Sequence, residues 1–127
     1  MKKLLLIIVM FTSTLLVEAQ TWRAYSLSVR SLENGTWTSW VTQGVDIEVT
    51  LDLNREELWI FSENVQKYTI IKKFNQYYDY TDGIKSEIFE YGVVDNNNVR
   101  ATFVARCGDD FVQIYIKYAD LEIMYQL

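Results

Sequence analysis

Apolar and polar side chains alternate most regularly over residues 45–54. Every second position there is apolar: Val45, Ile47, Val49, Leu51 and Leu53. A period of two places these side chains on one face of a strand and the polar ones on the other. Residues 54–56 then supply a turn, and residues 57–62 are typical of the return strand of a β-hairpin.

The return strand of this hairpin has two different faces. Leu58 and Ile60 share the face of the predicted core, which leaves Trp59 and Phe61 on the opposite face. We therefore expect Leu51, with Leu58 and Ile60, to lie in the core. Two rings on the far side fit a sheet that is covered at least partly on both sides.

The residues before this hairpin predict two more strands. Residues 22–32 alternate, and the face expected to be buried consists of Tyr25, Leu27 and Val29. Asn34-Gly35 is a strong hairpin signal, because both residues tolerate positive φ. Residues 37–42 are then the predicted partner strand, which ends near residues 43–44.

The residues after the hairpin continue the same alternation. Strands are predicted over residues 66–74 and 84–95, with a tight turn at residues 95–98. Residues 75–83, rich in tyrosine and aspartate, are expected to form a loop or a short edge segment. The clearest alternation follows in three C-terminal strands: 99–106, 112–118 and 121–127.

These strands together define the predicted fold class. The chain contains no proline, and no window outside the first 19 residues has a helical pattern. About eight or nine strands joined by short turns favour an all-β antiparallel meander. Such a meander closes into a small barrel or folds into a two-layer sandwich.

The N-terminus has the layout of a secretory signal peptide. A basic start is followed by an apolar run over residues 4–17, and Val17-Glu18-Ala19 fits a cleavage site. The run is shorter than the roughly 20 residues that span a bilayer, which disfavours a membrane anchor. We therefore predict a signal peptide, 1–19, and a single β-domain, 20–127. The product would be periplasmic or secreted, without stable membrane insertion after cleavage.

Composition narrows the classes of function. Losing Lys2, Lys3 and Glu18 with the signal changes the net charge from −5 to near −6 over the remaining 108 of the 127 residues. An acidic domain without a basic cluster is a poor candidate for binding nucleic acid. Cys107 is the only cysteine, so no intrachain disulfide forms. We predict that it is a small structural hydrophobe and not a nucleophile.

The sequence offers little catalytic chemistry. Histidine is absent, which removes the usual general base and the commonest zinc ligand. Asp79 and Asp82 among tyrosines would suit a sugar site with a carboxylate pair, although solvated loop acids are the preferred interpretation. Residues 78–83 fail the EF-hand pattern, because Tyr78 stands where an oxygen ligand is required. We predict no enzyme, no metal and no cofactor.

Aromatic residues are the candidates for binding. Rings of this kind are enriched in interaction hot spots. The predicted binding residues are those that break the face assignment of their neighbours: Trp59, Phe61, Tyr77, Tyr78 and Tyr80. If several share one surface, the patch would bind a protein or a glycan.

Several short motifs resemble those of a group of small exported all-β meander proteins of gut Bacteroidales and their phages. The resemblance rests on four stretches: Trp37-Thr38-Ser39-Trp40, Asp52-Leu53-Asn54-Arg55, Gln113-Ile114-Tyr115-Ile116 with Tyr118-Ala119-Asp120, and Met124-Tyr125. It covers the whole mature chain. The group has no established activity, so the resemblance assigns no functional residue.

Gly35-Thr36-Trp37 also resembles the Gly-x-Trp motif that opens the barrel of lipocalin-like proteins, although here a full strand precedes it. The leading hypothesis is a protein-interaction or envelope structural module. The alternative is a small-ligand or glycan-binding barrel, and a hydrolase that uses only carboxylates is third. An empty apolar lumen would favour a carrier, whereas a filled core with an aromatic patch would favour an interaction module. The oligomeric state is left open.

Overall fold

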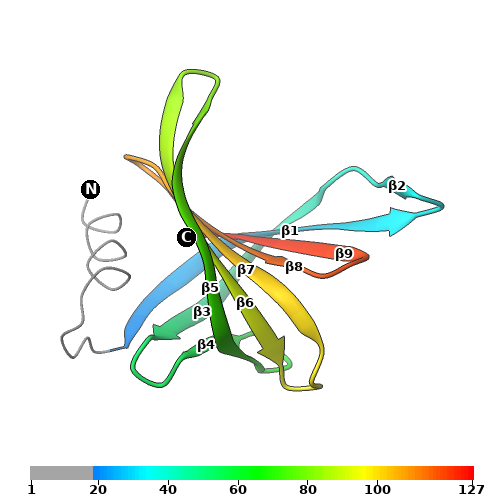
Figure 1. The fold of residues 1–127 in the computed structure, drawn as a ribbon. Coiled ribbons are helices and arrows are strands. Elements are labelled where there is room, and N and C mark those ends of the chain that lie inside the picture. The colour runs from blue at the N-terminus through cyan, green and yellow to red at the C-terminus, as the bar shows by residue number, and fades with distance from the viewer. Residues whose placement is uncertain (1–18) are drawn as a thin grey trace.

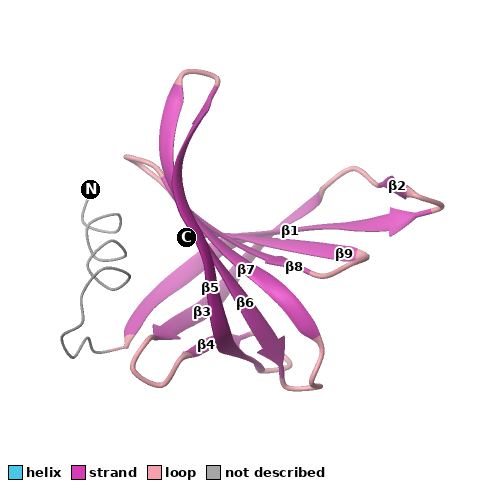
Figure 2. Cartoon of the chain, in the orientation of Figure 1, coloured by secondary structure: helices cyan, strands magenta, loops and turns pink. Residues whose placement is uncertain are grey.

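The computed structural model describes residues 19–127. Residues 1–18, which contain most of the predicted signal peptide, lie outside the described part. Strands joined by short turns make up residues 20–127, as Figure 2 shows. No helix among the described residues is long and apolar enough to cross a membrane.

The described residues contain nine strands. They are β1 (Gln20–Glu33), β2 (Thr36–Trp37), β3 (Val41–Asp52), β4 (Glu57–Phe61), β5 (Gln66–Thr81), β6 (Ile84–Asp95), β7 (Arg100–Cys107), β8 (Val112–Lys117) and β9 (Leu121–Gln126).

All neighbouring strands are antiparallel and form a single sheet that closes on itself. From β3 to β9 each strand pairs with the next one along the chain, and β1 pairs with both β3 and β9. Only β2 stands outside the resulting ring, paired with the end of β1 (Figure 1). This confirms the predicted all-β meander, closed here into a barrel-like ring.

The central hairpin has the predicted register. Leu51 lies opposite Leu58, and Val49 lies opposite Ile60. The connecting turn ends at Glu56, whose φ of 57° is a left-handed conformation. The three residues predicted for the core, Leu51, Leu58 and Ile60, are all buried.

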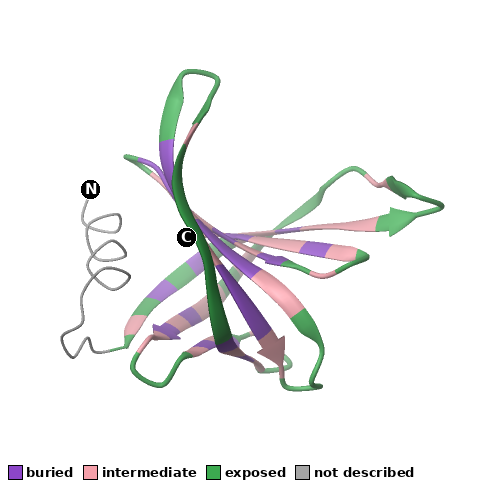
Figure 3. Cartoon of the chain, viewed as in Figure 1, coloured by how far each residue is buried: buried purple, intermediate pink, exposed green. Residues whose placement is uncertain are grey.

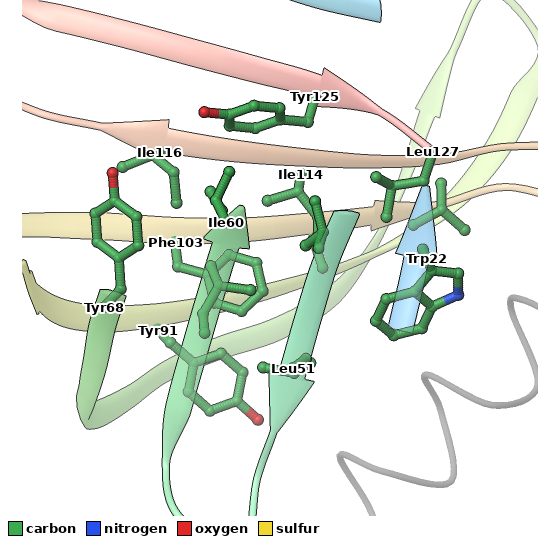
Figure 4. Packing of buried hydrophobic residues seen from close by; sticks show 14 of the residues in the cluster. Trp22, Leu51, Ile60, Tyr68, Tyr91, Phe103, Ile114, Ile116, Tyr125 and Leu127 are labelled. Atoms are coloured by element: carbon green, nitrogen blue, oxygen red, sulfur yellow. The ribbon is translucent and has the colours of Figure 1, made fainter. Parts of the chain in front are cut away.

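Side chains fill the interior of the ring. Ile60, Phe89, Phe103 and Ile116 each have an exposed fraction of 0%. Figure 4 shows the rings of Tyr68, Tyr91 and Phe103 gathered with aliphatic side chains between the strands. A ring of this size is just wide enough for side chains to occupy its centre. The core therefore leaves the outer faces of the strands as the surface for binding.

Of the two structures predicted for residues 75–83, a loop or a short edge segment, the loop is wrong and the strand is longer than expected. β5 continues to Thr81 and pairs with β6 up to Ile84, so this segment forms a β-hairpin. It projects beyond the ring (Figure 1) and is exposed along β5 (Figure 3). The segment has no buried face over most of its length. For that reason it lacks the apolar alternation that identifies a strand.

Two predictions for the N-terminal strands also need correction. Tyr25 is not buried, with an exposed fraction of 60%, whereas Ala24 is in the core. The register shifts between Ala24 and Ser26, which changes the inward-facing positions, and beyond the shift Leu27 packs against the core. The predicted partner strand over residues 37–42 is divided between β2 and β3. β3 runs unbroken through Gly44, because β1 is long enough to pair with it there.

Candidate functional site

The outer faces of β6, β7 and β8 carry two neighbouring hollows that share Lys117. We call the two together the outer groove. The charged hollow has a volume of about 300 Å³, and the bulge hollow a volume of about 420 Å³. The charged hollow lies over Ile88 and Val104, which are outside the core cluster, whereas the bulge hollow also reaches the core residue Val93.

The charged hollow has a small apolar floor. Ile88 and Val104 lie outside the main core cluster, yet only 6% and 5% of their surfaces are exposed. Val104 is paired across β7 and β8 with Tyr115, which lines the same hollow. The floor and its covering ring form a second, smaller apolar cluster on the outside of the barrel.

Aromatic rings and one arginine form one wall of the charged hollow. The Trp40 ring meets the Tyr115 ring edge-on, with centroids 6.4 Å apart. The Arg30 guanidinium lies 4.7 Å from the centroid of the Trp40 ring. Arg30 Nε also donates a 2.8 Å hydrogen bond to Oε1 of Glu122. Arg30 is thus held between Glu122 and the Trp40 ring, and the Trp40 ring in turn packs against Tyr115.

The opposite wall comes from the projecting hairpin. The Tyr77 hydroxyl donates a 3.0 Å hydrogen bond to Oε2 of Glu90. Burial, and then the hydrogen bond to Glu90, raise the pKa of Tyr77, so the phenol stays neutral at neutral pH. Arg106 donates to Oγ of Ser86 at 3.1 Å and lies 3.9 Å from Oδ2 of Asp79. Positive and negative groups therefore stand side by side around the hollow.

The bulge hollow takes its name from two irregularities in β5. The register against β6 shifts between Ile70 and Lys72 and again between Lys73 and Asn75, so Ile71 and Phe74 are extra residues. Both line the hollow. The second shift sets Phe74 against Gly92, where a Cβ atom would stand 2.8 Å from the ring. A side chain at position 92 would therefore require the Phe74 ring to shift.

The two hollows differ in charge. The charged hollow is lined by three cations and three carboxylates: Arg30, Arg106, Lys117, Asp79, Glu90 and Glu122. The bulge hollow is lined by Arg100 and Lys117, with no acidic residue among its lining residues. The Lys117 ammonium lies 5.5 Å from the centroid of the Tyr115 ring, between the two hollows. A ligand that spans both would thus meet mixed charge at one end and positive charge at the other.

A third hollow, of about 260 Å³, lies beside Glu87 and Cys107. Glu87 is 6% exposed; its Oε2 accepts a 3.3 Å hydrogen bond from Gln76, and its Oε1 has no partner among the described residues. Cys107 is 1% exposed and belongs to the core cluster, as predicted for a structural residue. Burial, with the charge of Glu87, raises the pKa of the Cys107 thiol to about 12. It is therefore protonated and unreactive at neutral pH.

The predicted binding residues do not share one surface. Trp59 and Phe61 stack on the outside of β4, with ring centroids 5.9 Å apart and planes 8° apart. Tyr77 lines the charged hollow, whereas Tyr78 lines the hollow beside Glu87 and lies under the Lys85 ammonium at 4.4 Å. Tyr80 is exposed near the tip of the hairpin. Alternation along β5 separates the tyrosines, because neighbouring side chains point to opposite faces.

Asp79 and Asp82 are also placed apart. Asp79 lines the charged hollow and accepts a 2.8 Å hydrogen bond from the Thr81 hydroxyl. Asp82 lies in the turn of the projecting hairpin with a φ of 53° and lines none of the three hollows. Among the described residues, no three His, Cys, Asp or Glu side chains are grouped so that they could hold a metal ion.

Sequence reasoning did not identify most of the outer groove, including Trp40, Tyr115 and Lys117. One signal was present in the sequence. Val104 and Tyr115 are apolar or aromatic residues on the otherwise polar faces of their strands. Once β7 and β8 are paired, the two lie opposite each other. An apolar pair on a polar face marks a second buried cluster.

The fold and the groove define the class of protein as a filled antiparallel β-barrel with a hollowed outer face. No family model, curated protein or solved structure matches the chain. The functional argument therefore rests on the chain's own residues.

Proposed function

We propose that this protein is an exported binding module that engages a protein partner through the outer groove. One observation carries the proposal. The interior is filled by side chains such as Phe89 and Phe103, while the outer face is hollowed and lined by rings and charges. A carrier needs a lumen for its ligand, whereas a partner protein needs an outer surface with anchoring rings and a polar rim.

The groove has the residue types that dominate protein interfaces. Tryptophan, tyrosine and arginine are enriched in binding hot spots, and Trp40, Tyr115 and Arg30 occupy one wall of the charged hollow. Ile71 and Phe74 add exposed apolar surface in the neighbouring bulge hollow. A partner segment that carries an apolar side chain and an acidic residue would suit the bulge hollow, because only cations stand among its charged lining residues.

A glycan is the second candidate ligand. Three rings, Trp40, Tyr77 and Tyr115, and three carboxylates line the charged hollow. Sugar rings stack on aromatic faces, and carboxylates accept hydrogen bonds from sugar hydroxyls. This alternative uses the same hollow and makes no demand on the interior of the barrel.

A binding survey with matched variants tests the proposal. The protein would be applied to an immobilised peptide library and to a glycan array, alongside Tyr115→Ala and Tyr25→Ala. Tyr25 is an exposed tyrosine on β1 that lines none of the three hollows. We expect peptide binding that falls about tenfold or more with Tyr115→Ala and is unchanged with Tyr25→Ala.

The other outcomes are equally informative. If the protein binds glycans and no peptide, and Tyr115→Ala weakens that binding about tenfold, the ligand of the outer groove is a glycan and not a protein. Binding that Tyr115→Ala, Trp40→Ala and Phe74→Ala all leave intact would refute the outer groove as the site. Circular dichroism and thermal melting of each variant separate loss of binding from loss of fold.

A further inference from the structure

The second half of β5 has an edge without a partner strand. β6 pairs with one side of β5 as far as Thr81, but β4 pairs with the other side only at Gln66–Thr69. Beyond this, the backbone N–H of Ile70 donates to the carbonyl of Glu56 at 2.7 Å. Over residues 19–127, no other strand pairs with that side of β5. Figure 3 shows β5 exposed along this length.

The protection of this edge changes along its length. Its first part carries two lysines, Lys72 and Lys73, and the two bulges at Ile71 and Phe74. Lysines and bulges are the features by which proteins keep foreign strands from a sheet edge. Residues 75–81 contain no lysine, no proline and no further register shift. An edge of this kind is a template for the addition of a strand.

We propose that a second copy of this chain occupies the edge, with the two β5 strands antiparallel. The distribution of charge along the edge carries the proposal. Its start is basic, with Lys72 and Lys73, and its end is acidic, with Asp79 and Asp82. In an antiparallel pair the basic start of each strand lies beside the acidic end of the other. The lysines that repel an unrelated strand thereby become ion-pair partners of a second copy.

A two-fold axis through this pair gives a closed dimer. Residues that face each other in an antiparallel pair lie on the same face of the sheet. A pair centred on Tyr77 sets Gln76 opposite the partner's Tyr78 and brings the basic start of each edge, beyond the bulge at Phe74, towards the acidic end of the other. The contact is isologous, so each contact away from the axis occurs twice. The two sheets become one continuous sheet across the dimer.

Charge reversal in two complementary variants tests the dimer. One variant carries Lys72→Glu and Lys73→Glu, and the other carries Asp79→Lys and Asp82→Lys. Each variant has one sign of charge at both ends of the edge, so two copies of the same variant repel each other. We expect each variant to be monomeric in sedimentation velocity, with a dimer dissociation constant raised about tenfold or more. A mixture of the two should restore a heterodimer, because every end then meets its opposite charge. Restoration on mixing also shows that neither variant had lost its fold.

A matched control keeps the change in net charge but not its position. The control variant carries Glu33→Lys and Glu63→Lys, two changes at exposed sites away from the β5 edge. It adds the same charge as Asp79→Lys with Asp82→Lys, and its dimer should persist. A monomeric wild type at the highest soluble concentration would overturn the proposal. So would a dimer that survives both reversed variants, or a mixture that stays monomeric. None of these readings uses a ligand, so the result is independent of the binding survey of the outer groove.

Discussion

Arg30 on β1 and Glu122 on β9 are joined by a 2.8 Å hydrogen bond between Nε and Oε1. The two residues are paired across the strands that close the ring. The Arg30 guanidinium also lies 4.9 Å from the centroid of the Trp37 ring and 4.7 Å from that of Trp40. The Arg30 side chain therefore contributes both to the pairing of β1 with β9, which closes the barrel, and to the wall of the charged hollow.

Arg30→Ala should destabilise the protein and also remove the contact that holds the Trp40 ring in the wall of the charged hollow. Glu122 is nearly buried, so removing its partner leaves a carboxylate without its charged donor. We expect a loss of about 1.5–3 kcal/mol in the free energy of unfolding, measured with urea. Glu122→Gln in the same background should recover part of the loss, since the unpaired charge is gone. If Arg30→Ala unfolds at the wild-type urea concentration, the pair does not stabilise the closure.

The core face of the central hairpin gives the second prediction. Ile60 is fully buried and lies opposite Val49, so Ile60→Ala leaves a cavity in a filled interior. We expect a cost of roughly 2–5 kcal/mol in urea unfolding. Val41→Ala is the control, because Val41 is exposed at the start of β3 and should change stability by no more than about 0.5 kcal/mol. Equal effects of the two changes would contradict the assigned core.

The residue pattern predicts this hairpin for a physical reason. One face of β3 and β4 is buried and the other is not, so burial imposes a period of two on the residues. The three C-terminal strands have the same arrangement, and all were predicted. Residues 75–81 differ because both faces of β5 are largely exposed there, although residues 86–89 of the neighbouring strand β6 are buried. Without a buried face, no alternation arises, and tyrosine and aspartate suggested a loop or a short edge segment.

The outer groove was harder to predict for another reason. Glu90, Arg106 and Lys117 look like ordinary solvent-facing residues when each strand is considered alone. They share one surface only because the register between β6, β7 and β8 aligns them. Register depends on turn geometry and on bulges, and the two bulges of β5 leave no clear signal in the residue pattern.

Asp95 provides a prediction about pH. Its Oδ2 accepts a 2.8 Å hydrogen bond from the Tyr118 hydroxyl, and its Oδ1 accepts 2.9 Å bonds from the N–H groups of Asn97 and Val99. Burial raises the pKa of Asp95, but the bonds from Val99, Tyr118 and Asn97 together outweigh it and lower the pKa below the ordinary value. The ionised form is therefore favoured in the folded state.

A lowered pKa stabilises the fold only while the carboxylate is ionised. This contribution is fully present above the unfolded-state pKa, about 3.9, and is lost as the pH falls through the lower folded-state pKa. Asp95→Asn should consequently be less stable than the wild type at neutral pH, and the difference should shrink in acid. Urea unfolding of both proteins from pH 7 downward measures it. A difference that does not depend on pH would show that the ionisation of Asp95 is not linked to folding.

Trp59 separates the aromatic pair on β4 from the outer groove. Its ring is half-buried, stacks on Phe61 and lies 5.7 Å from the Lys67 ammonium, and residues 19–127 form no second sheet that would cover it. Truncation should therefore cost less than a core substitution. We expect Trp59→Ala to lower the free energy of unfolding by about 1–2 kcal/mol, for lost area and lost stacking.

The same variant should leave binding at the outer groove intact. β4 is separated from β6 by β5 and from β9 by β3 and β1, and Trp59 lines none of the three hollows. Titration of the peptide selected in the binding survey should thus give the wild-type affinity for Trp59→Ala and a reduced affinity for Tyr115→Ala. If Trp59→Ala reduces the affinity and Tyr115→Ala does not, the binding site is the stacked pair on β4. A stability loss of roughly 3–5 kcal/mol would instead mean that Trp59 packs as a core residue does.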